Sequence, residues 1–93
     1  MKIVYDPRFS SSLNEILDYI SLDSQTRAMQ FQKNLKQKIE DLVKMPYMCR
    51  KSIHFEGENI RDLVFKGYAV VYNINESKEI IIIYGIKKYR ENF

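Results

Sequence analysis

The spacing of apolar residues divides the chain into a helical first half and an extended second half. From Leu13 to Ile20, apolar side chains recur three and four positions apart, which predicts the buried stripe of an amphipathic helix. Ser12 and Glu15 have the spacing of a capping box, so we expect this helix to begin at Ser12. A longer stripe of the same period predicts a second helix over residues 25–44. The two helices together form an αα-hairpin.

Beyond the second helix the apolar pattern is that of β-strands. Three segments are rich in the β-branched and aromatic residues that fit a pleated sheet: Ile60 to Phe65, Tyr68 to Ile74 and Glu79 to Lys87. Lys66-Gly67 is a two-residue connection with glycine second, where a positive φ is wanted, so the first two strands form a hairpin within a three-stranded antiparallel meander. Near the N-terminus, Lys2 to Tyr5 predicts a further short strand, which Asp6-Pro7 ends.

These elements predict an α+β fold in which one curved sheet packs on the αα-hairpin. A chain of 93 residues is too short for a second core, so residues 1–93 form one domain. Strict alternation along the last strand puts four side chains on one face and two on the other, namely Ile80, Ile82, Tyr84 and Ile86 against Ile81 and Ile83. One helical pair covers only one face. The other face is therefore expected to be shielded either by the curl of the sheet or by another chain.

Composition narrows the classes of protein that the chain can belong to. Fifteen Lys and Arg against twelve Asp and Glu give a net charge of +3, which suits an anionic partner without requiring one. The single cysteine, Cys49, excludes an internal disulfide and a zinc ribbon or finger. Neither a signal peptide nor a membrane-spanning run of apolar residues is recognisable. We therefore expect a cytoplasmic protein without a membrane segment, metal or cofactor.

Two segments of the predicted sheet resemble a known family. Residues 60–72 contain Arg61, a hydrophobic pair, the Gly67-Tyr68 hairpin and a closing Tyr72. Residues 80–90 form a hydrophobic strand that runs into a basic tail. With the order strand, helical hairpin, meander and basic tail, they resemble the RelE/ParE superfamily of bacterial toxins. The resemblance covers nearly the whole chain.

The resemblance implies the toxin of a type II toxin–antitoxin module, held inactive by a cognate antitoxin whose disordered segment folds around it. RelE-like members enter the ribosomal A site and cut messenger RNA, whereas ParE-like members inhibit DNA gyrase and are not nucleases. Both branches share one fold, so the site has to decide between them. A degenerate toxin, or a small RNA-binding module without catalytic activity, is the alternative from another class.

RNA cleavage through the 2′-hydroxyl requires a proton acceptor, cations for the charged phosphorane and an acid for the leaving oxygen. The resemblance implies that Lys, Arg and Tyr supply these groups. The catalytic candidates are Arg61, Lys88, Tyr89 and Arg90, and the RNA-binding candidates are Lys87, Arg50, Lys51 and His54. Strict alternation puts Lys88 and Arg90 on one face of the last strand and Lys87 and Tyr89 on the other. Because neighbouring strands lie about 4.8 Å apart, side chains from different strands meet at one phosphate only when they share a face.

Two departures from the family pattern bear on the choice of target. The position after Gly67-Tyr68 is commonly an arginine in both branches and contacts the substrate phosphate in RelE-like nucleases, but it is Ala69 in this chain. Several nucleases carry a histidine near the end of the last strand, whereas the single histidine of this chain is His54. The basic tail with Tyr89 favours ribosome-associated cleavage of messenger RNA, which is our prediction. Inhibition of DNA gyrase is the alternative.

Overall fold

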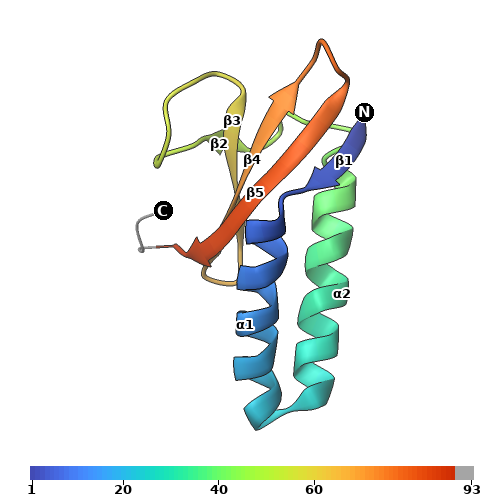
Figure 1. Ribbon diagram of the computed structural model, residues 1–93, viewed down its shortest axis with the longest axis vertical. Helices are drawn as coiled ribbons and strands as arrows, with labels where there is room; N and C mark the ends of the chain where they lie inside the picture. The colour runs from blue at the N-terminus through green and yellow to red at the C-terminus, as the bar shows by residue number, and fades with distance from the viewer. Residues whose placement is uncertain (90–93) are drawn as a thin grey trace.

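A hairpin of two helices packs on one side of a five-stranded sheet (Figure 1). The computed structural model describes residues 1–89. In chain order the elements are β1 (Lys2–Tyr5), α1 (Pro7–Asp23), α2 (Gln25–Asp41), β2 (Arg50–Lys51), β3 (Ile60–Phe65), β4 (Tyr68–Asn75) and β5 (Ile80–Lys88). The predicted α+β fold and the order of its elements are confirmed, and the short strand β2 is an addition that the sequence did not predict.

The strands lie in the order β1-β5-β4-β3-β2. β1 is parallel to β5, and the remaining pairs are antiparallel. Lys66 and Gly67, in the turn between β3 and β4, both have a positive φ, of 47° and 83°, which is the requirement of a tight two-residue hairpin. β2 pairs only with Arg61 and Asp62, so the outer edge of residues 63–65 has no strand partner within residues 1–89.

Both helices begin at a polar side chain that accepts a hydrogen bond from the first turn. Asp6 caps α1, and its carboxylate accepts the N–H of Arg8 at 2.8 Å. The expected start at Ser12 is therefore wrong, because Pro7 suits the first helical position, where its missing N–H is not needed. Ser24 caps α2 in the same way, with its hydroxyl 3.2 Å from the N–H of Arg27. α2 ends at Asp41, three residues before the predicted end.

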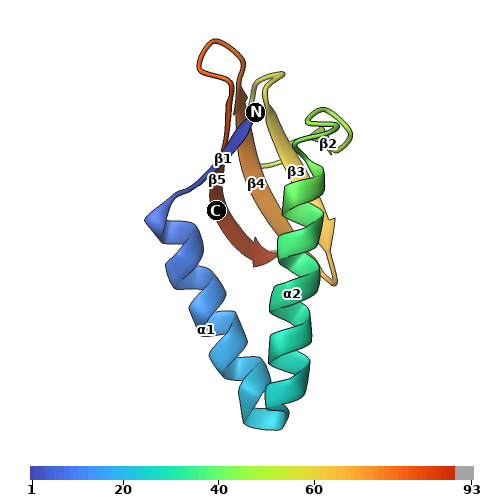
Figure 2. The same cartoon turned by 90° about the vertical axis from the view of Figure 1, so that its right-hand side faces the viewer.

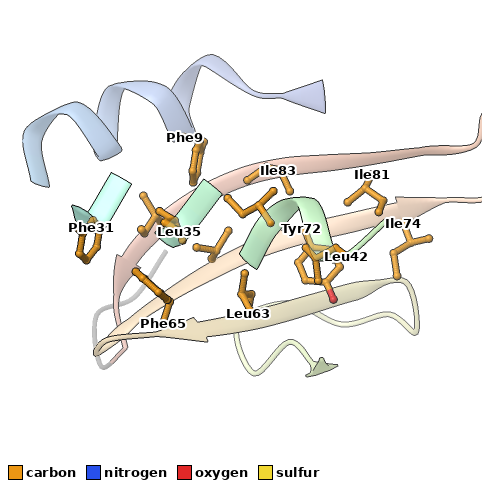
Figure 3. Packing of buried hydrophobic residues seen from close by; sticks show 13 residues of the cluster. Phe9, Phe31, Leu35, Leu42, Leu63, Phe65, Tyr72, Ile74, Ile81 and Ile83 are labelled. Carbon is orange, nitrogen blue, oxygen red and sulfur yellow. The ribbon is translucent and has the colours of Figure 1, made fainter. Parts of the chain in front are cut away.

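The core lies between α2 and the sheet, closed at one edge by Phe9 of α1 (Figure 3). α2 contributes one stripe of buried side chains, Phe31, Leu35 and Ile39, which Leu42 at its C-cap continues. The ring of Phe31 meets the rings of Phe65 and Tyr68 edge-on, with centroids 5.2 and 5.7 Å away, as aromatic pairs prefer. The apolar stripe of α1 is only half-buried against this core.

A β-bulge in β5 changes which face its residues occupy. Val71 of β4 pairs with Gly85, but the next residue, Tyr72, pairs with Ile83, so Tyr84 is an extra residue without a partner on β4. An extra residue reverses the alternation beyond it. Ile86 therefore joins Ile81 and Ile83 on the helix-covered side, where all three are buried. The predicted grouping of Ile86 with Ile80, Ile82 and Tyr84 is wrong for this reason.

The hairpin end of the two helices projects past the sheet (Figure 2). Tyr19, Leu22 and Met29 near this end are 73%, 85% and 70% exposed. The loop between β2 and β3 lies on the opposite side of the sheet from α2, to the left of Figure 1. We call the sheet surface on this side, turned away from α2, the open face.

The packing of α2 on the sheet is tested by two leucines of different burial. We expect Leu35→Ala to lower the free energy of unfolding by about 2–5 kcal/mol, because the leucine side chain is only 1% exposed and its removal leaves a cavity in the core. Leu22→Ala, at an exposed site, is the matched control and should cost at most about 0.5 kcal/mol. Urea denaturation measures both, and equal losses would contradict this core.

Candidate interaction site on the open face

A groove of about 550 Å³ lies on the open face. Its floor is made by β4 and β5, and a loop and the first turns of α1 form its sides. Its lining includes Arg8, Phe55, Val71, Tyr84, Gly85 and Lys87. Val71 is buried, whereas Phe55, from the loop between β2 and β3, is 45% exposed. The groove therefore offers apolar and aromatic surface bordered by two cationic side chains, Arg8 and Lys87.

The bulge at Tyr84 brings an aromatic ring to the side of this groove. The guanidinium of Arg8 lies 6.0 Å from the centroid of the Tyr84 ring. Arg8 is itself held by Asp6, since its Nε lies 3.0 Å from Oδ1 and its Nη2 lies 3.0 Å from Oδ2. These hydrogen bonds, with the N–H of Arg8, lower the pKa of Asp6. The N-cap of α1 thus also fixes a cation beside the groove.

A second set of side chains links β2 to the end of β5. Nη1 of Arg50 donates to the hydroxyl of Tyr89 at 2.7 Å, and the guanidinium lies 4.9 Å from the centroid of the Tyr89 ring. On its other side, Nη2 of Arg50 lies 3.9 Å from Oδ2 of Asp62. The N–H of Tyr89 donates to the carbonyl of Gly67 at 2.8 Å. The structure therefore brings together two of the residues that the sequence singled out, Arg50 and Tyr89.

Arg61 lies apart from this pair, on the helix-covered side of the sheet, because it pairs with the buried Tyr72. Its Nε donates to the carbonyl of Glu58 at 2.9 Å and its Nη1 to that of Cys49 at 3.0 Å. The guanidinium also lies 5.0 Å from the ring centroid of Tyr47, and the side chain is only 14% exposed. Arg61 thus holds the connection between α2 and β2 against β3.

The strand register separates Arg61 from the end of β5. Lys88 pairs with Tyr68, which lies four residues along β4 from Tyr72, the partner of Arg61. Four residues of strand span roughly 13 Å, and one more strand lies between the two side chains. The structure does not bring Arg61 to Lys88.

The two lysines of the tail face opposite sides of the sheet. Lys87 pairs with Ala69 and lines the groove on the open face. Lys88 pairs with Tyr68 and lines a smaller hollow against α1 with Glu15 and Tyr19, and Lys87 also borders this hollow. Ala69 is fully buried. Lys87 thus supplies a point charge on the strand next to Ala69, without the planar fork of a guanidinium.

The remaining candidates have separate surroundings. Lys51 forms an ion pair with Glu58, and this hydrogen bond lowers the pKa of Glu58. His54 lies in the loop between β2 and β3, where its backbone N–H donates to the hydroxyl of Ser52 at 3.1 Å. Arg90 lies outside the described residues.

Two tyrosines brace the segment that follows α2. The hydroxyl of Tyr72 donates to the carbonyl of Pro46 at 2.8 Å, and burial raises the pKa of this phenol. The hydroxyl of Tyr47 donates to Glu76 at 3.0 Å, and burial together with this hydrogen bond raises its pKa. Both phenols therefore stay protonated at neutral pH and act as structural hydrogen-bond donors.

Sequence reasoning missed Asp62, Tyr84, Phe55 and Arg8 as parts of this surface. One signal for the bulge was present, because a glycine within a strand pattern, here Gly85 beside Tyr84, often marks a bulge. Within residues 1–89, no group of three or more His, Cys, Asp and Glu side chains is arranged to hold a metal ion. None of the helices in this part of the chain is both long and apolar enough to cross a membrane.

Comparison with known proteins places the chain in a family. Residues 3–93 match the profile described as "ParE toxin of type II toxin-antitoxin system, parDE". The chain therefore belongs to the ParE toxin family and is the toxin of a type II toxin–antitoxin system. This confirms the resemblance to the RelE/ParE superfamily. No curated protein matches the chain.

Solved structures share this fold. The chain resembles the chromosomal ParDE system of P. aeruginosa with a TM-score of 0.74 and 15% identity, over 95% of each chain. It resembles the intact E. coli RelBE complex with a TM-score of 0.67 and 15% identity, over 97% of this chain and 98% of that one. The isolated E. coli RelE toxin gives a TM-score of 0.66 at 15% identity, over 98% and 86%. These likenesses show a common fold for both branches of the superfamily.

The role of Arg61 is tested by a substitution that keeps its charge. Lysine cannot donate to two carbonyls through a planar fork, so we expect Arg61→Lys to lower the free energy of unfolding by about 1–3 kcal/mol. Growth arrest by the expressed toxin should persist at a temperature where the variant is folded. Arg27→Lys, at an exposed helical ion pair, is the control and should change stability by less than about 0.5 kcal/mol. Lost arrest with unchanged stability would instead put Arg61 in the functional site.

Proposed function

We propose that the protein arrests growth in the cytoplasm by binding DNA gyrase through its open face, without cutting RNA, and that a cognate antitoxin holds it inactive. Membership of the ParE toxin family supports this proposal. The observation that carries it is the engagement of Arg61 by two backbone carbonyls and the ring of Tyr47. The cation that a phosphate would need from β3 is already used to hold the fold together.

The distribution of the other cations supports binding over catalysis. Stabilising a phosphorane requires several donors directed at one point. By strand register Lys87 and Lys88 point to opposite faces of the sheet, although both border the smaller hollow beside α1, and Arg61 lies roughly 13 Å along the strands from Lys88. An interface requires exposed aromatic and apolar groups flanked by polar ones, which the groove provides through Phe55, Tyr84 and Lys87.

Cleavage of messenger RNA on the ribosome is a second candidate function, and the contact between Arg50 and Tyr89 favours it. A guanidinium 2.7 Å from a phenolic oxygen can stabilise negative charge on that oxygen or on a bound phosphate. In this alternative, Tyr89 exchanges the proton while Arg50 and Lys87 bind the phosphate. Lys88 and Arg90 would assist from the tail, with Lys51 and His54 along the path of the RNA.

The two functions are separated with purified toxin. We expect it to inhibit DNA supercoiling by gyrase and to leave messenger RNA intact on translating ribosomes. Lys87→Ala should raise the half-inhibitory concentration by about tenfold, because it removes a cation that lines the groove. Lys33→Ala, an exposed lysine of α2, is the matched control and should have less than about a twofold effect.

Three outcomes decide against the gyrase proposal. Messenger RNA that is cut in a manner dependent on Tyr89, with unaffected supercoiling, would establish the second candidate. Arrest with intact messages and unimpaired gyrase would point to another target. An absence of arrest on induced expression would indicate a degenerate module.

A further inference from the structure

Asp62 is a buried carboxylate next to Arg50, the residue that contacts Tyr89. Its side chain has no exposed surface. Oδ2 accepts the N–H of Ile53 at 3.0 Å and lies 3.9 Å from Nη2 of Arg50. Within residues 1–89, Oδ1 has no hydrogen-bond partner. Burying a carboxylate lowers the stability of the fold unless the charge is paired. The contacts of Asp62 with Ile53 and Arg50 therefore matter for the stability of this part of the sheet.

The contacts form a continuous path from the buried carboxylate to the end of the last strand. Asp62 and Arg50 are directly paired residues of β3 and β2, so their side chains share the open face. Arg50 then reaches Tyr89, whose ring and hydroxyl both contact the guanidinium. β2, β3 and the end of β5 are thereby joined through one arginine.

We propose that Asp62 is a positioning residue of the target-binding surface: it holds Arg50, and Arg50 holds Tyr89, so that the pair receives an acidic group of gyrase. This inference rests on the function proposed above. Arg and Tyr are prominent among the side chains that dominate interface energies, and a side chain fixed before binding loses less entropy on association. Arg50 stays 40% exposed, which leaves part of its guanidinium able to meet a carboxylate.

The charges around the pair agree with an acidic partner. Lys87 lines the groove of the same open face, Arg8 lines it as the partner of Asp6, and the whole chain carries a net charge of +3. Asp62 lies 3.9 Å from Nη2 of Arg50 and offsets part of its charge, so an acidic group is attracted by the other cations of the open face together with the hydrogen-bond donors of Arg50. An acidic group would find the guanidinium already oriented.

Asp62 has a structural role that must be separated from this one, because it also anchors the loop that carries Phe55 through the N–H of Ile53. Asp62→Asn separates them. The amide has the same shape and keeps an oxygen that accepts the N–H, but it loses the charge that attracts Arg50. Glu58→Gln is the matched control, since it removes a carboxylate close by that pairs with Lys51.

The test is a double-mutant cycle on gyrase inhibition by the purified full-length toxin. We expect Asp62→Asn to raise the half-inhibitory concentration about tenfold, and the same change to have less than about a twofold effect when Arg50→Ala is already present. Glu58→Gln should change inhibition less than about twofold. Thermal unfolding of each variant checks that it is folded at the assay temperature. A purely structural Asp62 would instead impair inhibition equally in both backgrounds.

Unchanged inhibition by Asp62→Asn, or equal effects in both backgrounds, would overturn the inference while gyrase inhibition by the wild type stands. If Asp62→Asn does not fold, Arg50→Ala and Tyr89→Phe form the cycle: non-additive losses support the inference and additive losses overturn it. If the wild type does not inhibit gyrase, the proposed function fails and this inference fails with it.

Discussion

The β-bulge at Tyr84 is the constraint on which the rest of the sheet depends. Without the extra residue, Ile86 would lie on the open face and Lys87 would be directed at the helices. With it, Ile81, Ile83 and Ile86 all enter the core, and the lysine reaches the groove. The bulge shifts the pairing by one residue, so the side chains beyond it point to the opposite face from the one that strict alternation predicts. The strand can therefore bury its isoleucines and still present a lysine on the open face.

Most of the fold could be predicted because its signals are local. The stripe of α2, the three β-rich segments and the Lys66-Gly67 turn each lie within a short window, and the observed elements follow them. The start of α1 was misplaced because two capping signals compete, and a sequence does not show that Asp6 with Pro7 outweighs Ser12 with Glu15. The two-residue β2 lacks a pattern of its own and exists only through its pairing with β3.

The site was less accessible to sequence reasoning because its contacts join distant segments. Arg61 and Arg50 look alike in a sequence, yet one faces two backbone carbonyls beside Tyr47 and the other faces solvent beside Tyr89. An arginine on a strand has a structural role when its side chain faces backbone carbonyls, and it can bind a partner when its side chain faces solvent. Which of the two applies depends on the face of the sheet that the residue occupies. Asp62 was similarly hidden, since its burial and its contact with Arg50 arise only when β2 joins the sheet.

Because β2 is short, part of β3 forms an edge of the sheet that another chain could pair with. Along residues 63–65 the outermost N–H and C=O groups of the sheet face outward, and Val64 is 48% exposed beside them. Such an edge can template pairing with a second extended chain, which is the first step of aggregation. The neighbouring Lys66 and the tight turn it enters restrict this strip to a few residues, and a charged end of this kind discourages indiscriminate association. Within residues 1–89, the part of β3 left without a strand partner at this edge is thus three residues long, and β1 forms the opposite edge of the sheet.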